Sequence, residues 1–224
     1  KWENRNTNFL YGQPDGGPTH DAPQNGYLNR SRVSLDYIPR DNNHPYRPAI
    51  IFRMAEAYLS YAEALNESSE RMSHKQEILD NLNKIRHRAG IAEYGTGTDE
   101  NGFTRIKINF SDQKEVRRLI HKERRVEFVG EGVRYHDLRR WKTAHYGIGN
   151  LNEQGENPDW GVNGPDYGMN YYGTEYTDQG DNAFFKRTKY MDRVYPRKFY
   201  WYPIHQSEID KDPTLVQGPF WLGE

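Results

Sequence analysis

Two glutamates at helical spacing are the residues of this chain that come nearest to a catalytic pair. Glu123 and Glu127 lie one helical turn apart in the phrase Glu-Arg-Arg-Val-Glu. Two carboxylates placed in this way could serve as general acid and base, as in glycoside hydrolysis. The same phrase carries Arg124 and Arg125, and a guanidinium forms paired hydrogen bonds with a carboxylate. We therefore favour a structural role for these charges over a catalytic one.

A similar argument applies to the segment 51–66, where Glu56 and Glu63 stand among apolar neighbours. A carboxylate on a largely buried helix needs a cationic partner. Two later Arg-rich segments can supply such partners, so we expect one internal network of ion pairs. Its predicted members are Glu56, Glu63, Glu123, Glu127, Arg53, Arg86, Arg124, Arg125 and Arg139.

Other catalytic and metal-binding patterns are weak. The eight histidines show no metal-ligand spacing, and no Gly-x-Ser-x-Gly elbow or Gly-rich phosphate loop is present. The absence of cysteine excludes disulfides and thiol catalysis. The segment 178–182 could chelate calcium, but it lacks the twelve-residue loop pattern, so we interpret it as a polar turn. We predict no catalytic residue, no metal site and no cofactor.

Aromatic loops are the better candidates for function. The chain contains 17 Tyr and 5 Trp, and many of them lie in the loop-rich segments 2–46 and 145–195. A flat aromatic ring can cover the C–H face of a sugar, while nearby polar groups bind its hydroxyls. The predicted ligand-binding residues are Trp2, Tyr11, Tyr27 and Tyr37. The alternative is that each ring only anchors its own loop.

Composition narrows the class of protein. A net charge of -1 over 224 residues argues against nucleic-acid binding. No apolar run is long enough to span a bilayer. Since the chain begins with Lys1 rather than Met, we expect a processed or truncated product whose targeting sequence lay upstream.

The regular elements expected from the sequence are mostly helical. Proline and glycine punctuate residues 1–48, where only 33–38 could form a short strand. A helix is predicted over 51–66, with Met54, Tyr58, Tyr61 and Leu65 on its apolar face. The next helix should begin at a capping box of Ser73 and Gln76 and end at Gly90, forming an antiparallel hairpin with the first.

Two further helices are expected, one capped by Ser111 and one over 135–144. The chain then divides into a loop-rich lead (1–48), a helical core (49–144), a long loop excursion (145–195) and a packed tail (196–224). No regular structure is predicted within 145–195 because glycine recurs throughout it. The fold class is mainly α, with helical hairpins, long irregular aromatic-rich loops and little β-structure.

Five phrases in order carry a family resemblance. The first three are Arg-Met-Ala-Glu-Ala-Tyr-Leu (53–59) with Tyr-Ala-Glu-Ala (61–64), Leu-Asn-Lys-Ile-Arg-His-Arg-Ala-Gly (82–90) and Ile-His-Lys-Glu-Arg-Arg-Val-Glu-Phe (120–128). The last two are Glu-Gly-Val-Arg-Tyr-His-Asp-Leu-Arg-Arg-Trp (131–141), and Tyr-Pro-Ile (202–204) with Glu-Ile (208–209) and the ending Gln-Gly-Pro (217–219). In this order and spacing the chain resembles the C-terminal part of the SusD/RagB family. Its ending departs slightly from the more usual Gln-Asn-Pro-Gly form.

That resemblance implies a tetratricopeptide-like helical fold and a non-enzymatic function. Such proteins capture glycans, or in some members peptides, at the outer-membrane surface and deliver them to a SusC-like TonB-dependent transporter. They are anchored through an upstream lipidated cysteine, which this chain does not contain. Intact members are about twice as long, so a missing N-terminal half would be a further partner. The loops ahead of Arg53 are expected to contribute to the ligand surface.

Two rival functions remain from the sequence. A glycoside hydrolase would place two exposed carboxylates across a cleft, about 5–10 Å apart, and pairing of Glu123 and Glu127 with arginine would remove its best candidates. A helical scaffold that binds protein partners would show an apolar groove on the first two helices, but fewer than three repeats are visible.

Overall fold

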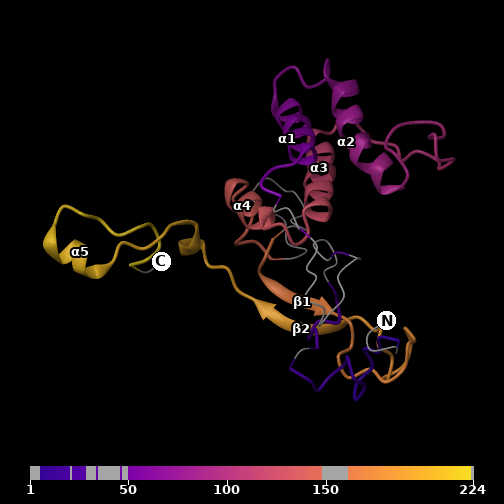
Figure 1. The fold of residues 1–224 in the computed structure, drawn as a ribbon. Helices are drawn as coiled ribbons and strands as arrows, with labels where there is room; N and C mark the ends of the chain where they lie inside the picture. Colours follow the sequence, from indigo (N-terminus) through magenta and orange to yellow (C-terminus); the bar gives the residue numbers. More distant parts are fainter. Residues whose placement is uncertain are drawn as a thin grey trace. The chain divides into compact units, whose positions relative to one another are not determined.

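The structure is a computed structural model that describes residues 6–20, 22–28, 34, 46, 50–147 and 161–222. The chain divides into two compact units, one of residues 34–140 and one of residues 1–33 with 141–224. The described part is mainly helical, and its named strands form one small two-stranded sheet (Figure 1). The predicted fold class is thereby confirmed. Within the described ranges, no helix combines the length and apolar character that a membrane span requires.

The unit 34–140 is built on three helices, α1 (Met54–Glu67), α2 (Lys75–Ala89) and α3 (Gln113–Glu127). Helix α1 packs against both α2 and α3 (Figure 1). Its Leu59 and Ala62 are fully buried, as are Leu82 of α2 and Ile120 of α3. These side chains belong to one continuous hydrophobic core.

The apolar face of α1 agrees only in part with the predicted one. Met54 and Tyr61 are 57% and 48% exposed, whereas the buried positions include Ala55, Leu59 and Ala62. The small alanines allow two neighbouring helices to approach closely, and the bulkier methionine and tyrosine are left on the outer side. The other two predicted positions do face the core, since Leu65 is buried and Tyr58 packs against it while partly buried.

The predicted starts of α2 and α3 are wrong, whereas the predicted end of α2 is right. Helix α2 begins after His74 and has no side-chain cap, so the capping box at Ser73 is wrong. Helix α3 is capped by Asp112 rather than Ser111, because the Asp112 carboxylate accepts the Lys114 and Glu115 amides. The predicted end at Gly90 is confirmed, since this residue has a φ of 67° and its amide bonds back to the last turn.

A short fourth helix, α4 (Val133–Arg140), completes the unit. It starts and ends earlier than the predicted 135–144. Its buried residues are Leu138 and the charged Asp137. A helix of two turns with one buried leucine has little apolar surface to fix it, so its polar contacts matter for its position.

In the other unit, a β-hairpin interrupts the expected loop excursion. Strand β1 (Gly164–Gly168) pairs antiparallel with β2 (Thr188–Arg193), with a bulge between Asp166 and Tyr167. The prediction of no regular structure in 145–195 is therefore wrong. The sequence between the two strands is long and rich in aromatic residues, and no short turn signal marks the pairing.

The tail contains a 3-10 turn, η1 (Arg197–Tyr200), and a short helix, α5 (Gln206–Lys211). Gln217 closes the tail on itself, because its amide both donates to the Ile204 carbonyl and accepts from the Ile204 amide. The strand predicted at 33–38 lies outside the described residues apart from Ser34, which has no regular structure.

Candidate functional site

The two glutamates with catalytic spacing are both paired with arginine. Glu123 is buried and accepts hydrogen bonds from Arg86 at 2.5 Å and from the Tyr94 hydroxyl at 2.7 Å. Glu127 accepts from Arg53 and, at 2.5 Å, from Arg88. The pKa of Tyr94 is raised, chiefly by burial and then by the Glu123 charge. The carboxylates that a glycoside hydrolase would need are thus already engaged within the fold.

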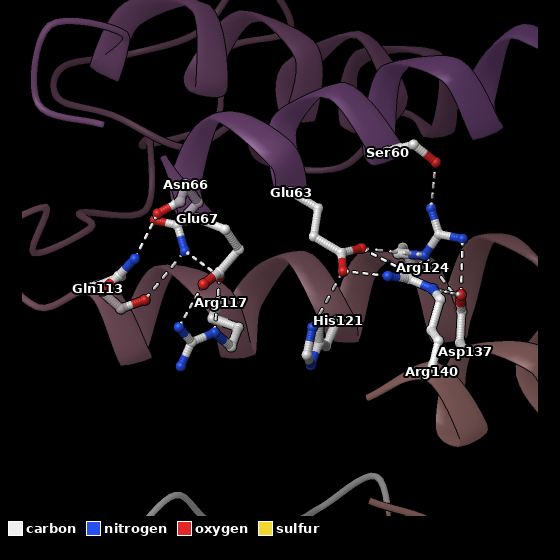
Figure 2. Close-up of polar contacts among 10 residues, drawn as sticks. All are labelled: Ser60, Glu63, Asn66, Glu67, Gln113, Arg117, His121, Arg124, Asp137 and Arg140. Carbon is white, nitrogen blue, oxygen red and sulfur yellow. Dashed lines mark hydrogen bonds and ion pairs between the residues drawn. The ribbon is translucent and has the colours of Figure 1, made fainter. Parts of the chain in front are cut away.

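A second charged cluster joins α1, α3 and α4 (Figure 2). Arg124 of α3 forms a bidentate pair with Asp137 of α4, both bonds being 2.9 Å. Arg140 of α4 forms a second bidentate pair with Glu63 of α1, at 2.5 and 2.6 Å. Arg124 also donates to the Ser60 hydroxyl at 3.0 Å. Arg124 and Asp137 are each only 3% exposed. The cluster therefore fixes α4 through an ion pair that is shielded from solvent.

His121 lies beside this cluster and is 4% exposed. Its Nε2 is 4.0 Å from Glu63. Burial lowers the pKa of His121 to about 2, and the nearby positive charges of Arg140 and Arg117 act in the same direction. The imidazole is consequently neutral at physiological pH. It behaves as a buried packing residue rather than as a catalytic acid.

The other predicted charged residues have different surroundings. Glu56 is half-buried and makes no ion pair with a described residue. Arg125 is exposed on α3, and Arg139 donates to the Tyr135 hydroxyl at 2.6 Å. Sequence analysis missed Arg88, Glu131, Asp137 and Arg140, which complete the observed pairs. Asp137 could have been found from its position within the Arg-rich phrase His-Asp-Leu-Arg-Arg.

Tyr11 and the adjacent pair Tyr171 and Tyr172, which are distant in sequence, form a cluster of aromatic rings in the unit 1–33 with 141–224. We call Tyr11, Tyr171 and Tyr172 the tyrosine cluster. The ring centroids of Tyr11 and Tyr172 are 5.3 Å apart, those of Tyr171 and Tyr172 are 5.2 Å apart, and those of Tyr11 and Tyr171 are 6.2 Å apart. Tyr172 is 68% exposed. Within the described part of the chain, none of the three hydroxyls has a hydrogen-bond partner.

The backbone holds this cluster in place. The Tyr11 amide donates to the Gly173 carbonyl at 2.8 Å, joining the two loops. A Cβ on Gly17 would lie 2.4 Å from the Tyr171 ring, so only glycine lets this ring pack on the backbone. The buried Asn170 donates to the carbonyls of Asp181 and Ala183 and fixes the turn that carries both tyrosines.

Tyr176 is an example of a tyrosine that anchors its own loop. The Tyr176 hydroxyl donates to the Asn8 side chain at 3.0 Å and accepts the Phe9 amide at 2.8 Å. Its ring also packs on Phe184 and Phe185. Both the ring and the hydroxyl of Tyr176 are therefore used by the protein itself, whereas Tyr172 has ring contacts but no hydroxyl partner among the described residues.

The predicted ligand-binding residues have separate outcomes. Tyr11 lies in the tyrosine cluster. Tyr27 is 57% exposed and has no ring contact with another described aromatic residue. Trp2 and Tyr37 lie outside the described residues. Tyr171 and Tyr172 were not selected from the sequence, although the adjacent pair in an aromatic loop was a usable signal.

The polar turn at 178–182 offers no metal site in the structure's described ranges, where no group of three or more potential ligands is found. Asp181 instead pairs with Lys186 at 2.8 Å, and this hydrogen bond lowers the pKa of the carboxyl.

The sequence of this chain is similar to those of several known proteins. The model of the SusD family matches residues 2–221. SusD-like protein P25 of Formosa agariphila is 32% identical over 109 residues, covering 49% of this chain and 18% of that protein. SusD-like protein P38 of the same organism is 32% identical over 103 residues, covering 46% of this chain and 19% of its own length.

Solved structures give the same result at the level of fold. A SusD-like protein from Bacteroides fragilis superposes with a TM-score of 0.61 and 26% identity, covering 92% of this chain and 33% of that chain. The structure described as BT4246 has a TM-score of 0.50 and 29% identity over 79% of this chain. The chain thus spans about a third of the length of the Bacteroides fragilis protein. It spans a smaller share of BT4246 and of SusD-like protein P25.

Proposed function

Because the chain belongs to the SusD family, we propose that it takes part in non-enzymatic capture of oligosaccharides, with the tyrosine cluster as its ligand surface. The glycan is stacked and hydrogen-bonded, and no covalent step is required. The proposal extends to the whole protein, which would sit at the outer-membrane surface and pass its ligand to a SusC-like TonB-dependent transporter. Family membership supports these wider roles.

The observation that carries the proposal is the exposed side chain of Tyr172. Its ring is supported from the side by Tyr11 and Tyr171, and 68% of the residue is exposed. A supported ring loses little conformational entropy when a flat ligand stacks on it. The hydroxyls of the cluster, which have no partner in the described ranges, can donate to and accept from sugar hydroxyls.

The contrast with the charged residues supports binding over catalysis. Glu123 and Glu127 are committed to arginine partners, so they are poorly placed to exchange protons with a substrate. The tyrosine cluster brings a stacking surface but contains no pair of carboxylates. This arrangement suits a protein that holds a sugar and releases it unchanged.

A glycan array of starch, host-type and plant oligosaccharides, followed by calorimetry on the best ligand, tests the proposal. Tyr172→Ala should weaken binding about tenfold, which corresponds to about 1.4 kcal/mol. Tyr190→Ala is the matched control, since Tyr190 is an exposed tyrosine of β2 with no aromatic neighbour in the described ranges. It should leave affinity unchanged.

Three results would overturn the proposal. One is equal loss of affinity in both variants, and another is no binding to any glycan on the array. A third is the appearance of cleaved product when the bound oligosaccharide is incubated with the protein and analysed by mass spectrometry. Binding to a peptide library in place of the glycan array would point to peptide capture instead.

A further inference from the structure

The unit 34–140 has a hollow of about 840 Å³ that the tyrosine cluster does not share. It lies along α2 and the following segment 93–110, with Tyr58 of α1 at one wall. This volume is within the range of small-molecule binding pockets. The residues of the hollow that carry the argument are Tyr58, Lys75, Lys84, Arg105, Lys107 and Phe110.

Lysine side chains dominate the unpaired charge of this hollow. The Lys84 Nζ lies 4.5 Å from the centroid of the Tyr58 ring, and the Lys75 Nζ lies 5.2 Å from that of Phe110. Neither lysine, nor Lys107, has a carboxylate partner in the described part of the chain. A ring face attracts an ammonium but accepts no strong directional hydrogen bond, so the N–H groups remain available.

Arg105 adds a second, independent observation. Its Nη2 donates to Glu93 at 2.9 Å, but its Nε is buried and finds no acceptor among the described residues. A buried donor without an acceptor costs about 1–3 kcal/mol. The Arg105 side chain lines the hollow and is 32% exposed, so its guanidinium adds positive charge there.

The acidic and amide groups of the hollow are largely satisfied. Glu93 accepts from Arg105 and lies 3.2 Å from the His87 Nδ1. Asp80 accepts from Gln76 at 2.8 Å. The Asn83 side chain both donates to and accepts from the Tyr94 backbone.

Asp80 accepts only from a neutral amide, so Asp80 and the exposed Glu100 are the two carboxylates of the hollow that have no ion pair with a described residue. Three lysines, Lys75, Lys84 and Lys107, likewise have none. What the hollow still offers a ligand is therefore mainly positively charged donors.

From this geometry we propose that the hollow is a second glycan site that binds an anionic oligosaccharide through a carboxylate or sulfate group held by Lys75, Lys84 and Arg105. It rests on the proposed function, which it deepens by naming acidic sugars as one ligand class. Lysine acts as a point charge toward such groups, and an anionic acceptor shortens and strengthens the hydrogen bond.

Calorimetry with the whole chain tests the site with tetragalacturonic acid, a chondroitin sulfate tetrasaccharide and neutral maltotetraose as probes. We expect at least one of the two acidic probes to bind, with the carboxylate and sulfate sources distinguished by which one does. A Lys75→Gln and Lys84→Gln double variant should weaken that binding at least tenfold, and raised salt should weaken it in the wild type. Lys122→Gln is the control, because Lys122 is an exposed lysine of α3 that is not part of the hollow.

Other results would overturn the site without touching the proposed function. If Tyr172→Ala abolishes acidic-sugar binding while the lysine double variant retains it, the acidic ligand occupies the tyrosine cluster. If hexaglutamate binds as tightly as the acidic sugars and is equally sensitive to the lysines, the hollow takes acidic peptides. Absence of binding by either acidic probe removes the proposal outright, whatever the glycan array shows for Tyr172.

Discussion

The two units of this chain treat their polar side chains in opposite ways. In the helical unit, Arg124, Asp137 and Glu63 are buried and hydrogen-bonded to one another or to neighbours. In the other unit, the hydroxyls of the tyrosine cluster have no partner in the described ranges, and Tyr172 is mostly exposed. The comparison teaches that satisfied polar groups mark what holds a fold together. Polar groups that are held in place by neighbouring rings but lack a hydrogen-bond partner mark where a ligand can bind.

The largest effect should come from breaking the buried charge cluster. Arg124→Ala leaves Asp137 buried without its bidentate partner, which is expected to destabilise the fold by about 3–5 kcal/mol. Urea denaturation followed by circular dichroism measures this change. Lys122→Ala on the exposed side of the same helix should change stability by less than about 0.5 kcal/mol. A loss below 1 kcal/mol for Arg124→Ala would show that the cluster is not structural.

Acid should destabilise the same region through His121. The folded pKa of about 2 lies below the unfolded value near 6.5, so only the unfolded state gains a proton as pH falls through this window. Stability is therefore full above about pH 6.5, and His121 alone should cost about 2 kcal/mol by pH 5.

His121→Gln removes this titration, which gives the prediction an internal control. The difference in free energy of unfolding between wild type and variant should become smaller, or reverse, from pH 7 to pH 5. A difference that is constant across these two pH values would contradict a neutral buried histidine.

Removing a single hydroxyl distinguishes a tyrosine that anchors its loop, Tyr176, from one that is proposed to bind ligand, Tyr172. Tyr176→Phe loses hydrogen bonds to Asn8 and Phe9 and should lower stability by about 1 kcal/mol. Tyr172→Phe should leave stability unchanged but weaken glycan binding, because its hydroxyl has no partner among the described residues and is proposed to bind the ligand. Thermal melts and calorimetry on both variants separate the two roles. The reverse pattern would mean that Tyr172 is the anchor.

The smallest effect is expected at an ion pair that keeps contact with water. Arg117 forms a bidentate pair with Glu67 at 2.6 and 2.7 Å, and the two side chains are 24% and 39% exposed (Figure 2). Glu67→Gln should cost between about 0.2 and 1 kcal/mol. A cost as large as that of Arg124→Ala would show that burial does not separate the two kinds of pair.

Much of the helical unit was predictable because local signals determine it. The composition of residues 54–67 favours a helix, and Gly90 ends α2 in the left-handed conformation that glycine adopts most easily. The repeated Arg and Glu residues also indicated that charges would pair. Their partners were less predictable, since Asp137 and Arg140 are selected by the packing of a short helix and not by a periodic pattern.

The sequence by itself determined the helical class, the family and the wealth of aromatic loops. Each of these depends on residue types and on spacing along the chain. Only the tertiary structure decided that Tyr11 meets Tyr171 and Tyr172, because the contact joins residues some 160 positions apart through backbone hydrogen bonds and a glycine. It likewise decided which carboxylates are buried beside arginine. Pairing and burial depend on which surfaces meet, and that information is not local to any segment.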